Sequence, residues 1–104
     1  MKLKADFVTN SSSASFTILK SNLTNDQIEM IRDHINIAKI IAEERGFLIN
    51  SYDENKRSIY LDQWQINEDE QTINGYTTMD NFDMLWFLHC IGVKREVVDY
   101  DGET

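Results

Sequence analysis

The chain has 104 residues, of which 41% are hydrophobic and 11% aromatic, as is typical of one small globular domain with a modest core. Asp and Glu residues outnumber Lys and Arg by 18 to 10 and give a net charge of −8. This charge disfavours direct binding to nucleic acid and favours association with basic protein surfaces, although acidity that only keeps the protein soluble stays an alternative. The single cysteine excludes a disulfide within the chain. Because we find no apolar leader or long apolar run, we expect a cytoplasmic protein without a membrane partner.

Residues 1–20 predict an extended lead-in, a hairpin or a loop between two strands. Apolar residues on either side of a polar run favour strands, and the polar side chains between them favour a turn. No phosphate-binding or nucleophile motif surrounds the serines, so we interpret them as an exposed loop that is able to recognise a peptide or ligand. The loop candidates are Asn10, Ser11, Ser12, Ser13 and Ser15.

The same segment carries a family resemblance. The run from Asp6 to Phe16 reads DFVTNSSSASF and resembles the N-terminal signature DFVTNSSSxSF of small bacterial and phage proteins whose function is not established. The resemblance implies a bacterial or phage origin, and it transfers no active site. Ala14 interrupts the serine run that the signature usually shows.

Residues 24–45 predict one long helix, because its start, its apolar face and its end can each be read from the sequence. Thr24 and Gln27 have the spacing of a capping box. Gly46 can adopt the left-handed conformation that ends a helix, so we expect the helix to end at Arg45. One apolar stripe recurs at three- and four-residue steps and should face the core: Ile28, Ile31, Ile35, Ala38 and Ala42.

Residues 47–78 predict three consecutive strands joined by short polar turns, which favours an antiparallel meander. The turns fall at 53–56 and 67–70. Apolar residues in the middle strand change face near Asp62 or Gln63, which indicates a bulge.

Residues 80–91 predict a second helix capped by Asp80, with Asp83 near its positive end. This helix is apolar nearly all round, so it is either deeply buried or partly an interface. Residues 96–100 favour a last strand. Together these elements predict a small single domain, 1–104, of the α+β class, with a meander packed against one long and one shorter helix.

Candidate catalytic groups are few. Neighbouring residues on a helix point about 100° apart, so His89 and Cys90 cannot act as a base and nucleophile pair, and His34 is distant in sequence. Two aspartate pairs lack the further ligands that a metal site needs. We therefore assign no catalytic residue, metal or cofactor. The aspartate pairs are Asp80 with Asp83, and Asp99 with Asp101.

Aromatic residues should mostly fill the core of so small a domain, and any that are exposed would be interface anchors. Acidic turns would surround such an anchor, although successive turns of a meander lie at opposite ends of a sheet. The interface candidates are Asp53, Glu54, Trp64, Glu68, Asp69, Glu70, Tyr76 and Trp86.

These features favour a small acidic protein-binding module without enzymatic activity that occupies a basic site on a host protein. With the resemblance above, its most concrete form is an inhibitor encoded by a phage or mobile element, of the anti-CRISPR or another anti-defence type. Two alternatives stay open. One is a small-molecule or nucleotide-binding protein that uses the Ser-rich loop, and the other is a homodimer or self-assembling structural component with helix 80–91 at the interface.

Overall fold

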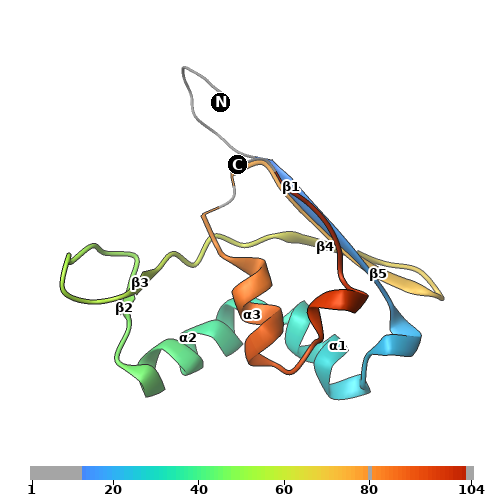
Figure 1. Ribbon diagram of the computed structural model, residues 1–104, viewed down its shortest axis with the longest axis horizontal. Coiled ribbons are helices and arrows are strands. Elements are labelled where there is room, and N and C mark those ends of the chain that lie inside the picture. The colour runs from blue at the N-terminus through green and yellow to red at the C-terminus, as the bar shows by residue number, and fades with distance from the viewer. Residues whose placement is uncertain (1–12, 80, 103–104) are drawn as a thin grey trace.

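The computed structural model describes residues 13–79 and 81–102, which form three α-helices, two 3₁₀ helices and two β-sheets. The larger sheet has four antiparallel strands in the order β4-β5-β1-β6, and the α-helices lie on one side of it (Figure 1). The predicted α+β class is confirmed. The four strands are β1 (Ala14–Leu19), β4 (Gln65–Glu68), β5 (Thr72–Thr77) and β6 (Asp99–Gly102).

Strand β1 runs through the middle of this sheet and alternates between a buried and a solvated face. Phe16 and Ile18 are buried in the core, whereas Thr17 and Leu19 are exposed. Such alternation is expected where an antiparallel sheet is covered on one side only. Phe16 pairs with Gly75 of β5, and its ring fills the space that a side chain at Gly75 would occupy.

The capping box predicted for the first helix is present. After β1 the chain passes through the 3₁₀ helix η1 (Lys20–Asn22) into α1 (Asn25–Arg32). Thr24 Oγ1 accepts a hydrogen bond from the Gln27 backbone N–H at 3.1 Å, and Gln27 Oε1 accepts one from the Thr24 N–H at 2.9 Å. Two backbone donors that the helix leaves unsatisfied are thereby paired.

The single helix predicted over 24–45 is wrong in one respect, because it bends at Asp33. This residue has φ −109° and ψ 34°, and it separates α1 from α2 (His34–Arg45). The predicted end is confirmed: Gly46 follows α2 with φ 72°, in the left-handed region.

The meander predicted for 47–78 is wrong in its first half. Strands β2 (Leu48–Ile49) and β3 (Ser58–Ile59) have two residues each and pair in parallel, in a separate sheet. Residues 60–64, where we expected a bulge, belong to no strand. Only β4 and β5 form the expected antiparallel hairpin.

The second predicted helix begins later than Asp80. Helix α3 spans Met84–Cys90, and its N-cap is Asp83, whose carboxylate accepts a hydrogen bond from the Trp86 N–H at 3.0 Å. The Phe82 carbonyl accepts a hydrogen bond from Trp64 Nε1 at 3.1 Å. This carbonyl is therefore paired with a core side chain and not with a backbone N–H of a longer helix.

The chain after α3 returns to the sheet. Gly92 has φ 89°, and the 3₁₀ helix η2 (Arg95–Val97) leads into β6, which pairs with β1. The last strand predicted at 96–100 therefore exists, but it is displaced to 99–102.

His34, directly after the bend, is a central polar residue of the core. Its Nε2 accepts a hydrogen bond from the Trp64 backbone N–H at 3.0 Å, so Nδ1 carries the proton and donates to the Ile31 carbonyl at 2.8 Å. Its ring lies 5.3 Å from Phe82 and 6.3 Å from Phe87, centroid to centroid. Burial lowers the pKa of His34 below its ordinary value, and the Ile31 carbonyl and Asp33 only partly oppose this effect.

Candidate protein-interaction site

Helix α3 has one buried face and one open face. Met84, Phe87 and Leu88 are buried in the core, where the Phe87 ring lies 6.3 Å from that of His34 in α2, whereas Leu85 and Trp86 are half-buried. The helix is thus neither fully enclosed nor fully solvated, and its open face is where the predicted anchor Trp86 lies.

Trp86 belongs to a small aromatic cluster that includes an arginine. The Arg57 guanidinium carbon lies 5.3 Å from the centroid of the Phe47 ring and 5.6 Å from that of Trp86, and the two rings are 6.2 Å apart. Tyr60, which is 40% exposed, follows β3 and lines one pocket together with Arg57 and Trp86. We call Phe47, Arg57, Tyr60 and Trp86 the Trp86 surface. It holds a cation against two aromatic faces, an arrangement that restricts the arginine's rotamers.

A groove of about 420 Å³ lies beside Trp86 between α3 and the segment that leads into β6. Its lining is mainly apolar. Arg95 lies in its wall, where Nη1 donates to the Val98 carbonyl at 2.9 Å and the guanidinium lies 6.0 Å from the centroid of the Tyr100 ring. The residues of this α3 groove are Asp83, Leu85, Trp86, Leu88, His89, Val93, Arg95 and Val98.

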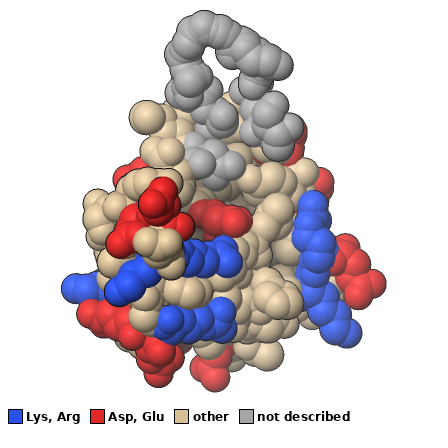
Figure 2. Space-filling view, turned by 60° about the vertical axis from the view of Figure 1, so that its left-hand side comes forward, with Lys and Arg blue, Asp and Glu red and all other residues tan. Residues whose placement is uncertain are grey.

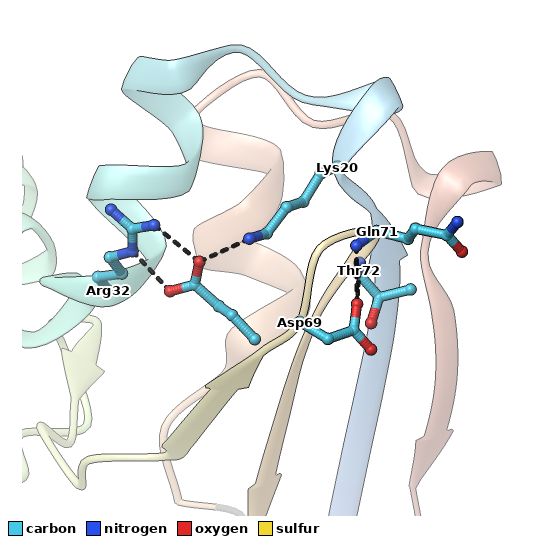
Figure 3. A network of polar contacts seen from close by, with 6 residues as sticks. Lys20, Arg32, Asp69, Gln71 and Thr72 are labelled. Carbon is cyan, nitrogen blue, oxygen red and sulfur yellow. Dashed lines mark hydrogen bonds and ion pairs between the residues drawn. The ribbon is translucent and has the colours of Figure 1, made fainter.

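Glu68, predicted to surround an interface anchor, is instead engaged within the chain. Its two carboxylate oxygens accept from Arg32 Nε and Nη2 at 2.6 and 2.7 Å, and Lys20 Nζ lies 3.0 Å away (Figure 3). These hydrogen bonds lower the pKa of Glu68 to about 2, and the bond from Arg32 has a larger effect than the bond from Lys20. Glu68 therefore joins α1 and η1 to the end of β4.

Asp69 is also engaged locally. Its Oδ1 accepts from the backbone N–H groups of Gln71 and Thr72 at 2.8 and 2.7 Å, and these bonds lower its pKa (Figure 3). It shapes the β4–β5 turn. Of the three carboxylates predicted in this turn, Glu70 is the one without such a role in the described structure.

The other predicted interface residues are dispersed. Asp53 and Glu54 are exposed in the β2–β3 loop, at the opposite end of the molecule from the β4–β5 turn (Figure 1). Trp64 is only 1% exposed, so its prediction as an interface anchor is wrong. Tyr76 is 46% exposed, but it lies on the open face of the sheet, away from the core. The eight candidates therefore do not form one site.

An acidic groove lies at the helix bend. Asp26, Glu29 and Asp33 line a hollow of about 320 Å³ together with Met30 and Ile37. Elsewhere, charges of both signs are interspersed over the face shown in Figure 2. The face shown in Figure 2 is thus not uniformly acidic.

The serine candidates are only partly described. Asn10, Ser11 and Ser12 lie outside the described residues, and Ser13 is exposed. Ser15 belongs to β1 and pairs with Tyr76 and Asp101, so its prediction as a loop residue is wrong.

Among the described residues, no group of three or more His, Cys, Asp or Glu side chains is placed to hold a metal ion. Cys90 is half-buried, and His89 beside it is exposed on the rim of the α3 groove. His34 uses both ring nitrogens in the core.

Sequence reasoning missed Arg57 and Arg95. Neither is part of a motif, and both reach their positions through tertiary contacts with aromatic rings. The signal that could have indicated them is weak, since it consists only of residue type: arginine and aromatic residues are both enriched at protein interfaces.

No helix in the described parts of the chain is long and apolar enough to cross a membrane. Comparison of the chain with protein-family models, with curated proteins and with solved structures gives no match.

Proposed function

We propose that this chain is a non-enzymatic protein-binding domain whose anchor is the Trp86 surface. The observation that carries this proposal is the half-buried Trp86, whose ring lies 5.6 Å from the Arg57 guanidinium carbon and which also lines the 420 Å³ α3 groove. Tryptophan, tyrosine and arginine are the residues that most often dominate binding energy at protein interfaces. An apolar groove next to such residues can receive a side chain from a partner.

The overall charge supports a partner with a basic surface. A net charge of −8 favours approach to a positive surface, and the acidic groove at the helix bend gives that attraction a local contribution. In this proposal, long-range charge guides association, while burial of Trp86 supplies the short-range free energy.

The most concrete form of the proposal is an inhibitor encoded by a phage or mobile element, of the anti-CRISPR or another anti-defence type, that occupies a basic site on a host protein. The small size, the acidity and the N-terminal resemblance support it. No direct contact with nucleic acid is part of the proposal.

The test is affinity capture of the tagged chain from a lysate of its native host, at low and moderate salt and after nuclease treatment. We expect one stoichiometric partner with a basic site, which is retained after nuclease and weakened as salt rises. Recovery of the chain alone, at a multimeric mass, would instead favour self-assembly through α3 and contradict the proposal for that host.

A further inference from the structure

Ser58 carries a buried hydroxyl that has no hydrogen-bond partner among the described residues. The residue opens β3, and its Oγ is inaccessible to solvent but makes no hydrogen bond in the described structure. Buried hydroxyl groups are paired in the great majority of proteins, because an unpaired one is destabilising. Such a group is often completed by something that the polypeptide itself does not supply.

Ser58 is one of the residues that line a pocket of about 120 Å³, which we call the Ser58 pocket. One water needs only about 10–15 Å³ of such space, so the pocket has room for a group of several heavy atoms. Its walls combine aromatic faces with polar side chains. The residues that matter to the argument are Arg57, Ser58, Tyr60, Asn81, Asp83 and Trp86.

Arg57 supplies a positive charge at this pocket, and no carboxylate of the described residues forms an ion pair with it. The ion pairs among the described residues involve Lys20, Arg32 and Glu68, so Arg57 has no carboxylate partner there. Its guanidinium is held against the Phe47 and Trp86 rings instead. A guanidinium fixed in this way presents N–H groups in a planar fork, which matches the two oxygens of a carboxylate.

The other charged group in the lining is already engaged. Asp83 accepts the Trp86 N–H as the N-cap of α3. Its negative charge, with the net charge of −8, disfavours a doubly charged ligand such as phosphate. A singly charged, planar group fits the pocket better than a larger polyanion.

We propose that the Ser58 pocket binds a small carboxylate, paired with the Arg57 guanidinium, hydrogen-bonded by the Ser58 hydroxyl and packed against Trp86. This proposal names a ligand chemistry that the proposed function does not, and the case in which the carboxylate comes from a bound protein rests on that function. The carboxylate belongs either to a free small acid or to an acidic side chain of a bound protein. Both sources present the same chemistry to the pocket.

The test is a titration of the full chain, followed by two-dimensional ¹H–¹⁵N NMR. The probes are propionate, its neutral isostere propionamide, and two blocked tripeptides, Gly-Glu-Gly and Gly-Gln-Gly. We expect saturable shifts at residues 57–60 and at the Trp86 indole with propionate, with a dissociation constant on the order of millimolar, and none with propionamide. Binding of the Glu peptide more tightly than propionate indicates a protein side chain, whereas the reverse order indicates a free acid.

Two variants test the proposed contacts of the carboxylate with Arg57 and with Ser58. Arg57→Gln should weaken propionate at least tenfold and Ser58→Ala about five- to tenfold. The matched controls Arg45→Gln and Ser51→Ala, at exposed positions outside the pocket, should leave the affinity unchanged. Because no protein group among the described residues pairs with the Ser58 hydroxyl, Ser58→Ala should not lower the unfolding midpoint.

Three results would each overturn the proposal. The first is the absence of saturable shifts, and the second is an equal response to propionate and propionamide. The third is a lower unfolding midpoint for Ser58→Ala, which would show that the hydroxyl already has a partner such as ordered water. The Ser58 pocket shares Arg57, Tyr60 and Trp86 with the Trp86 surface, but capture of a protein is measured without these probes, so failure of the titration and failure of capture are distinguishable.

Discussion

Replacing His34 tests how the core is joined to the bend between α1 and α2. His34→Leu fills much of the same space but leaves the Trp64 N–H without its acceptor and the Ile31 carbonyl without its imidazole donor. An unsatisfied buried polar group costs about 1–3 kcal/mol, so leaving both groups unpaired should lower the free energy of unfolding by about 2–6 kcal/mol. His34→Gln can still offer an acceptor to Trp64, and we expect it to lose about 1–2 kcal/mol.

The wild-type chain should also show a pH dependence that His34 causes. Burial lowers the pKa of His34 from its ordinary value of 6.5, so the unfolded chain takes up a proton at a higher pH than the folded chain does. The stability contributed by neutral His34 is complete above about pH 6.5 and is lost as pH falls toward the folded pKa. The free energy of unfolding should decline by at most about 1.4 kcal/mol per pH unit in this window.

The assay is urea unfolding followed by tryptophan fluorescence, at about pH 7.5 and about pH 5.5. His34→Leu and His34→Gln should both lose the extra pH dependence of the wild type. His89→Gln is the matched control, since His89 is exposed, and it should retain that dependence. A His34→Gln protein with the wild-type slope would refute the argument, as would a His34→Leu protein that is as stable as the wild type near neutral pH.

Three further predictions concern other contacts. Thr24→Ala removes the capping box and should lower the free energy of unfolding by about 1 kcal/mol in a urea titration; no loss would mean that the cap is not formed in solution. Gly75→Ala places a methyl group against the Phe16 ring and should cost about 1–3 kcal/mol, whereas unchanged stability would contradict this packing. Glu68→Gln should cost at most about 1 kcal/mol at low salt and less at high salt, because the ion pair lies at the surface. The stability due to ionised Glu68 is present above about pH 4.5 and is lost as pH falls toward about 2, so the wild type and Glu68→Gln should converge in acid; a constant difference would contradict the lowered pKa.

Local signals in the sequence predicted the helix boundaries that depend on neighbouring residues. The Thr24 capping box and the Gly46 stop each involve residues within one turn, and both are confirmed. The bend at Asp33 is different. It places His34 where the ring accepts a hydrogen bond from the Trp64 backbone, 30 residues along the chain, and periodicity within the helix carries no trace of that contact.

The predictions of the α3 start and of the strand pairing were wrong for the same reason: both features depend on contacts between residues distant in sequence. Asp80 and Asp83 are both good caps by residue type, and the choice between them coincides with the Phe82 carbonyl being engaged by the buried Trp64 indole. Likewise, the two-residue strand β3 lies in parallel beside β2, which no hairpin rule predicts. The candidate site could not be predicted either, because Arg57 contacts Trp86 only through the placement of β3.

The measurement that tests the central claim most directly is the affinity of Trp86→Ser for the captured partner, by calorimetry, beside wild type and Tyr76→Ala. Tyr76 is the matched control, because it is an exposed aromatic on the open face of the sheet. The account predicts at least a thirtyfold loss for Trp86→Ser, about 2 kcal/mol, and less than a threefold change for Tyr76→Ala, with all three chains folded by circular dichroism. Wild-type affinity in a folded Trp86→Ser chain would contradict the claim that the Trp86 surface is the anchor.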